Sequence, residues 1–159
     1  MSVWEIDLEG LDLLNANQRL HFHPKAKRTK ALRDEACDAA RDQGIPPLPR
    51  AVVLGYVHPD SNRRYDPPNY YPSFKAAVDG LVDAGVLADD DHTRLSGPHM
   101  YPAPKTGRRG VFRLRLVVAA DAWRCLCGHD GAEHIGAGGR CVRPGCGCLY
   151  HRPAGGAVA

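Results

Sequence analysis

The chain has 159 residues, of which 43% are hydrophobic, and its formal net charge at pH 7 is +3. This length allows one domain with a hydrophobic core and a small appendage. No run of residues is long and apolar enough to cross a bilayer, and the N-terminus, MSVWEIDLEG, lacks the basic segment of a secretory signal. These features exclude a membrane-spanning protein and favour a cytoplasmic one.

Charged residues are distributed unevenly along the chain. Residues 13–33 and 92–120 contain basic but no acidic side chains, whereas Asp79, Asp83 and the run Asp89–Asp91 lie between these two segments. A basic surface around a cluster of acidic residues indicates that the protein binds a polyanion close to a bound cation. Solvated surface charge would produce the same pattern.

Hydrophobic periodicity predicts four strands. Residues 3–8 alternate apolar and polar side chains, and residues 51–58, AVVLGYVH, form the β-branched run of a buried strand. Residues 93–105 indicate a strand that is interrupted. Residues 110–120 alternate arginine-bearing and apolar positions, which predicts one basic face and one apolar face.

Two helices are expected between these strands. The first spans residues 29–44 with Thr29 as its N-cap, and the second spans residues 72–84 with one apolar stripe. Residues 13–30 have no clear periodicity and are expected to form a loop. The order of elements predicts an α/β (α+β) domain over residues 1–120, a small mixed sheet packed by two helices.

Aspartates collect in the loops of this domain. Asp66 follows a buried strand, and Asp89–Asp91 follow the second helix. Carboxylates from two loops could converge on Mg²⁺, which prefers oxygen ligands and needs only one or two carboxylates beside water and phosphate. Lys75 and Asp79 lie four residues apart on one helix face and could meet a phosphate and a metal ion. Alternatively, the acids are solvated loop residues and Lys75–Asp79 is an ordinary surface pair.

The run HPDSNRRYDPPNYYPSFKAAVDGLVDAGVLADDDH, residues 58–92, resembles the RusA family of Holliday-junction resolvases. The family pattern is a basic turn, Asp-x-Asp-Asn, a helix with Lys and Asp four residues apart, and a late Asp-Asp pair. The matching positions, with an early asparagine at Asn17, are Arg63, Arg64, Asp66, Asn69, Lys75, Asp79, Asp89 and Asp90. The resemblance covers about residues 3–118.

This resemblance implies a Mg²⁺-dependent homodimeric endonuclease that cuts opposed strands of a four-way junction, a form of branched DNA. The implied catalytic residues are Asp66, Lys75, Asp79 and Asp90. The implied Mg²⁺ ligands are Asp66, Asp79, Asp89 and Asp90. The residues expected to contact DNA are Asn17, Arg19, Lys25, Lys27, Arg28, Lys30, Arg63, Arg64, Asn69, Arg108 and Arg109. Phe22 would either wedge into the junction or anchor a loop on the core.

The chain departs from the family pattern in two places. Pro68 stands where the family has its second aspartate, and the segment between Asn69 and Lys75 is longer. Either Asn69, Asp89, Asp91 or water replaces the missing ligand and the protein cuts DNA, or only DNA binding remains.

Five of the six cysteines lie between Cys125 and Cys148, among histidines and glycines. The segment has little apolar material for a core, so a structural zinc ion would stabilise it. We expect a zinc module over residues 121–153, followed by a disordered tail, 154–159. The candidate ligands of one tetrahedral site are Cys125, Cys127, His134, Cys141, Cys146 and Cys148. Two zinc ions sharing these groups with His129 and His151 is an alternative. With one zinc ion or two, the module could bind DNA, contact a partner or cap the domain. Besides a nuclease and a protein that only binds DNA, a third interpretation is a zinc-ribbon adaptor whose α/β core is only a scaffold.

Overall fold

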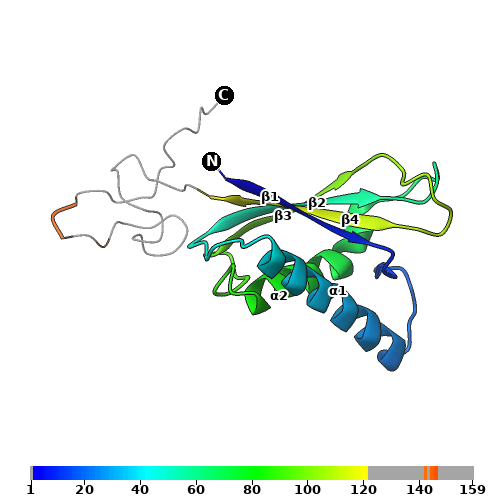
Figure 1. Ribbon diagram of the computed structural model, residues 1–159, viewed down its shortest axis with the longest axis horizontal. Helices are drawn as coiled ribbons and strands as arrows, with labels where there is room; N and C mark the ends of the chain where they lie inside the picture. The colour runs from blue at the N-terminus through cyan, green and yellow to red at the C-terminus, as the bar shows by residue number, and fades with distance from the viewer. Residues whose placement is uncertain (1, 122–141, 143, 147–159) are drawn as a thin grey trace.

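The computed structural model describes residues 2–121, 142 and 144–146 (Figure 1). The elements in chain order are β1 (Val3–Glu9), α1 (Phe22–Asp42), β2 (Ala51–His58), the 3₁₀ helix η1 (Pro67–Tyr70), α2 (Tyr71–Asp83), β3 (Leu95–Pro102) and β4 (Arg113–Ala120). The strands form one sheet in the order β1-β4-β2-β3, in which only β2 and β3 are parallel. The predicted α+β class, a mixed sheet packed by two helices, is therefore confirmed. Most of the predicted zinc module and the tail lie outside the described residues.

Both helices pack on the same face of the sheet (Figure 1). The strands alternate, so Ile6 and Leu8 of β1 and Leu114 and Leu116 of β4 are fully buried against the helices. Gly55 of β2 lets the ring of Phe74 approach closely, because a Cβ at Gly55 would lie 2.6 Å from Cδ2 of that ring. Phe74 thereby anchors α2 over the centre of the sheet.

The opposite face of the sheet carries paired charges. Asp7 of β1 lies beside Arg115 of β4 and accepts two hydrogen bonds of 2.8 Å from its guanidinium group. Glu9 lies beside Arg113, with 3.6 Å between Oε2 and Nη1. The basic face predicted for residues 110–120 is present, but acidic side chains of β1 neutralise much of it.

Helix α1 begins at Phe22, so the predicted loop over residues 13–30 and the predicted N-cap at Thr29 are wrong for residues 22–30. Pro24 is tolerated there because the first-turn N–H groups have no partner within the helix. Thr29 lies inside the helix and donates a hydrogen bond of 2.9 Å to the carbonyl oxygen of Lys25. The first turns are exposed on nearly all sides, so their sequence carries no apolar stripe. Among the residues that the structure describes, no helix has both the length and the apolar character needed to cross a bilayer.

Helix α2 ends as predicted near Gly85, which adopts a φ of +78°. The amide of Gly85 donates to the carbonyl oxygen of Val82 at 2.9 Å, and the amide of Val86 donates to that of Leu81 at 3.0 Å. These bonds satisfy the last carbonyl groups of the helix. The chain then buries Val86 and Leu87 and passes through the three aspartates into β3.

Candidate functional site

Lys75 joins two of the predicted acidic residues. Its ammonium group forms an ion pair with Asp79, one turn later on α2, and a second pair with Oδ2 of Asp90 at 2.6 Å. We call these three residues the Lys75 cluster. Asp90 belongs to the segment between α2 and β3, so the cluster connects two elements. It borders a small pocket of about 120 Å³ that Tyr71 and His92 also line.

The charge state of Lys75 follows from these contacts. Partial burial by itself lowers the pKa of Lys75, but the hydrogen bonds and charges of Asp79 and Asp90 outweigh it and raise the pKa above its ordinary value of 10.5. Lys75 therefore stays protonated at neutral pH. Its side chain is 43% exposed, so part of it is accessible to solvent.

The three consecutive aspartates have separate partners, which explains how adjacent like charges are tolerated. Asp89 accepts a hydrogen bond of 2.7 Å from the backbone amide of Asp90. Asp90 pairs with Lys75. Asp91 accepts bonds from the hydroxyl group and the amide of Thr93, which lower the pKa of Asp91. Only Asp90 turns toward the predicted catalytic lysine.

Asp66 lies in a second pocket, of about 300 Å³, at the end of β2. We call it the Asp66 pocket, and the residues of its wall that matter below are Asn15, Arg63, Arg64, Asn69, Tyr70 and Phe112. Asp66 is exposed, and its carboxylate has no hydrogen bond or ion pair with any described residue. The Asp66 pocket and the pocket at the Lys75 cluster are lined by consecutive residues, Tyr70 and Tyr71, at the start of α2.

The structure brings two of the four predicted Mg²⁺ ligands together. Asp79 and Asp90 meet at Lys75, whereas Asp66 lines the other pocket and Asp89 bonds the backbone. Within residues 2–121, 142 and 144–146, no three acidic, histidine or cysteine side chains form a group that could hold a metal ion. Mg²⁺ often takes only one or two protein carboxylates with water and phosphate oxygens. The cation that Asp79 and Asp90 both hold in this structure is the ammonium group of Lys75.

The predicted DNA-binding residues differ in whether an acidic side chain already holds them. Paired residues are Arg28 with Asp12, Lys30 with Asp34, Arg63 with Asp60 and Arg108 with Glu9. Within the described part of the chain, no hydrogen bond or ion pair holds the charged groups of Arg19, Lys25, Lys27, Arg64 and Arg109. These unpaired cations are the ones most available to phosphate.

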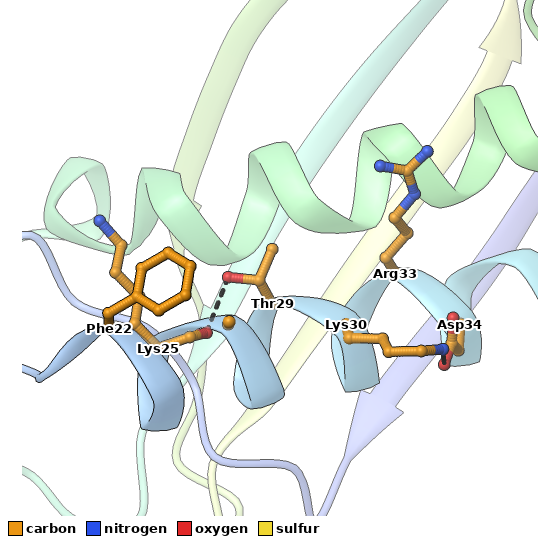
Figure 2. A pocket seen from close by; sticks show the side chains of 7 residues that line it. Phe22, Lys25, Thr29, Lys30, Arg33 and Asp34 are labelled. Carbon is orange, nitrogen blue, oxygen red and sulfur yellow. Dashed lines mark hydrogen bonds and ion pairs between the residues drawn. The ribbon is translucent and has the colours of Figure 1, made fainter.

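The first half of α1 carries a wide shallow groove of about 560 Å³, the α1 groove. Figure 2 shows Phe22 and Lys25 at one end of this helix face and Arg33, Lys30 and Asp34 at the other. The groove is larger than either pocket near the predicted catalytic residues, and it lies on a basic surface. Phe22 is 78% exposed, so the interpretation that it anchors a loop on the core is wrong.

Sequence reasoning missed part of the Asp66 pocket. The resemblance predicts Asn17 at this site, but Asn17 is exposed, and its backbone amide donates a hydrogen bond to Oδ1 of Asn15, which lines the pocket with Asn69. The spacing of the two asparagines gave no means of choosing between them. Phe112 falls within the strand predicted over residues 110–120, but it precedes β4 and lines the pocket.

The zinc candidates other than Cys146 lie outside the described residues. Cys146 is a free, partly exposed thiol. The metal prediction for this segment therefore stays a prediction. No protein-family model matches the chain, and no curated protein matches it either.

Proposed function

We propose that the chain is a Mg²⁺-dependent endodeoxyribonuclease that cuts four-way junctions and other branched DNA, acting as a cytoplasmic homodimer in recombination, repair or phage replication. The observation that carries the proposal is the ion pairing of Lys75 with both Asp79 and Asp90. The same three residues match the RusA pattern in the sequence. Asp66 and Asn69, which match the pattern as well, lie in the neighbouring pocket.

The roles follow from the chemistry of each side chain. Mg²⁺, when bound by Asp79 and Asp90, would polarise a phosphate oxygen and lower the pKa of a bound water molecule. Lys75 would stabilise the negative charge that develops on the phosphate, because it carries a positive charge and its side chain is partly exposed. Asp66, free of protein partners among the described residues, would orient or deprotonate the attacking water.

The unpaired cations would bind phosphate groups of the DNA other than the one that is cleaved. Lys25 and Lys27 extend from α1, while Arg64 lies beside Asp66. Phosphate contacts of this kind position DNA without reading its sequence. Phe22, exposed at the first turn of α1, would insert between bases at the branch point.

The experiment is incubation of the full-length protein with an end-labelled synthetic four-way junction, with and without Mg²⁺. Symmetrical cuts in two opposed strands that need Mg²⁺ are the expected result. Asp90→Asn should abolish cutting and retain binding, because it removes one carboxylate of the Lys75 cluster. Intact junction at every protein and metal concentration would overturn the proposal.

A second function, branched-DNA binding without cleavage, is favoured by Pro68 and by the separation of Asp66 from the Lys75 cluster. The substitution Pro68→Asp distinguishes the two functions. If the natural protein is an active nuclease, the added carboxylate changes cutting little. If the core only binds DNA because a carboxylate is missing, the natural protein leaves the junction intact and Pro68→Asp restores cutting.

A further inference from the structure

The geometry points to the Asp66 pocket as a subsite for one unstacked deoxyribonucleotide, next to the branch point of the DNA. This inference rests on the proposed function, because the nucleotide belongs to the branched substrate. The pocket has a volume of about 300 Å³, at the lower end of the range for small-molecule sites. It therefore suits a single nucleotide and is too small for a duplex.

One wall of the pocket is aromatic. The rings of Tyr70 and Phe112 lie 6.1 Å apart between centroids, with their planes inclined by 31°. Tyr65, which also lines the pocket, meets Tyr70 edge to face at 6.4 Å. All three side chains are partly exposed. Aromatic rings in such a groove bind unstacked bases of any identity, because every base has a π face.

The polar wall offers groups that lack protein partners. Arg64 is exposed, and within the described residues neither its guanidinium group nor the side chains of Asp66 and Asn69 form a hydrogen bond or ion pair. A free guanidinium group suits a phosphate. The amide of Asn69 can both donate to and accept from the edge of a base, which leaves the carboxylate of Asp66 to its proposed role toward water. The pocket thus has complements to the phosphate and to the edge of a base.

The walls are already held in place. Asp60 accepts a hydrogen bond of 3.0 Å from the amide of Gly110, which joins the loop after β2 to the segment before β4. The carbonyl oxygen of Asn69 accepts a bond of 2.7 Å from the amide of Ala16. The hydroxyl group of Tyr65 donates to the backbone of β2. Three separate segments are therefore fixed around the pocket, which reduces the ordering cost of binding.

A nucleotide can enter this pocket only after it leaves the helical stack. That step is least costly where base pairing is already broken, as it is for a mismatched or single-stranded base. The crossover of a four-way junction offers strained or unpaired nucleotides, whereas a linear duplex does not. The Asp66 pocket would therefore favour branched DNA over duplex DNA.

Photochemical crosslinking tests the assignment. 5-Iododeoxyuridine is placed in turn at each position beside the branch point of a synthetic four-way junction, and the full-length protein is bound without Mg²⁺ and irradiated. Mass spectrometry then identifies the crosslinked residue. The expected result is a crosslink to Tyr70 or Phe112 from at least one junction position and from no position of the matched linear duplex.

Three outcomes are distinguishable. Crosslinks to the aromatic wall support the subsite. If the junction binds but the crosslinks map elsewhere, or arise equally from duplex, the subsite is overturned while the proposed function stands. If the protein binds no branched DNA, the proposed function fails and the subsite fails with it.

Affinity measurements give an independent check. Phe112→Leu and Tyr70→Leu should each weaken junction binding by roughly 5- to 100-fold, because a stacked ring is lost, and leave duplex binding unchanged. Arg64→Gln, an exposed position with no contact that the fold needs, should also weaken junction binding selectively. Tyr101→Leu, an exposed ring stacked on Tyr56, is the control and should change neither affinity. Equal losses for junction and duplex in the three pocket variants would overturn the subsite.

Discussion

Neighbouring residues of identical chemistry acquire different roles in this protein through their partners. Asp89 and Asp91 accept hydrogen bonds from backbone amides of their own loop, whereas Asp90 reaches the ammonium group of Lys75. The lysine in turn depends on both of its carboxylates for a raised pKa. At this scale the proposed function therefore rests on one of three adjacent aspartates, Asp90, and on one lysine, Lys75.

Replacing Lys75 by Met should reduce junction cleavage by about 10²- to 10³-fold, the usual effect of losing one group that stabilises transition-state charge. Junction affinity should change little, because in the proposed complex many other cations would contact phosphate. Lys75→Arg keeps the charge and should retain part of the activity. Lys105→Met, at an exposed position, is the control. Single-turnover cleavage with saturating protein measures the effect, and an unchanged rate in Lys75→Met would contradict the assigned role.

His58 should make the stability of the domain depend on pH. It is buried, and its Nδ1 lies 2.8 Å from the carbonyl oxygen of Pro104. Burial lowers the pKa of His58 from its ordinary value of 6.5, the bond to Pro104 partly opposes this, and the charges of Arg113 and Arg115 lower the pKa further. The unfolded chain therefore binds more protons than the folded chain just below pH 6.5.

Because the pKa of His58 is lower in the folded chain than in the unfolded chain, its contribution to stability is complete above about pH 6.5. This contribution is lost as the pH falls through the lowered pKa. Chemical unfolding between pH 7.5 and about 5 should show a decreasing free energy of unfolding. His58→Gln, which can still donate to Pro104, should flatten the curve, and His99→Gln at an exposed site should not. A curve of the same slope in wild type and His58→Gln would rule out this histidine as the cause.

At the scale of elements, the contact between α1 and α2 sets the position of the Lys75 cluster. Gly80 is the point of closest approach: a Cβ there would lie 2.9 Å from Cβ of Ala36, 3.0 Å from the amide nitrogen of Cys37 and closer still to the carbonyl oxygen of Arg33. The Arg33–Asp83 ion pair joins the same two helices. One glycine therefore permits the packing that holds α2 over the sheet.

Gly80→Ala should destabilise the protein by about 1–3 kcal/mol, although alanine favours an isolated helix, because the methyl group overlaps the backbone of α1. Asp38→Ala, at an exposed position of α1, should change stability by less than about 0.5 kcal/mol. Denaturant unfolding measures both variants. A Gly80→Ala protein as stable as wild type would mean that the helices can separate without cost.

The basic half of α1 should determine how DNA affinity depends on salt. Lys25 and Lys27 are exposed and form no ion pair with any residue that the structure describes, whereas Lys30 is paired with Asp34. Each lysine that neutralises a duplex phosphate contributes about 0.9 to the slope of log K against log salt concentration. The double variant Lys25→Ala/Lys27→Ala should lower the slope by about 2. Lys30→Ala should lower the slope by clearly less than about 0.9, and a decrease of about 0.9 would show that pairing does not govern availability.

Sequence patterns predict the strands and α2 well because each of these elements has one buried face, so its apolar residues recur at a regular spacing. The first turns of α1 were missed because exposed lysines and alanines leave no such period. The site was predicted only in part for a related reason. The family pattern indicates Asp66, Lys75 and Asp90. Whether their side chains meet depends on the path of the chain from α2 to β3, and no local sequence pattern predicts that path.

At the scale of the whole molecule, the described residues form one core within the α+β domain. In this described part of the chain, the fully buried core side chains lie between Ile6 and Val118. The end of β4 is fixed by Arg50 and Asp121, whose side chains pair at 2.9 Å and whose backbones share a hydrogen bond of 3.0 Å. The cysteine-rich segment follows Asp121 in the sequence, and its cysteines and histidines predict that a zinc ion stabilises it.

We expect the full-length chain to contain about one zinc ion, since one tetrahedral site uses four of the candidate ligands. Cys141→Ser and Cys148→Ser should lose zinc, because each removes a predicted thiolate, whereas Cys37→Ala, at a buried position of α1, should retain it. A chain ending at Asp121 should bind no zinc and still unfold cooperatively near the wild-type temperature. Elemental analysis and thermal unfolding test both parts. Full-length protein without zinc would remove the metal prediction, whereas an unfolded truncated chain would mean that the core needs the C-terminal segment after all.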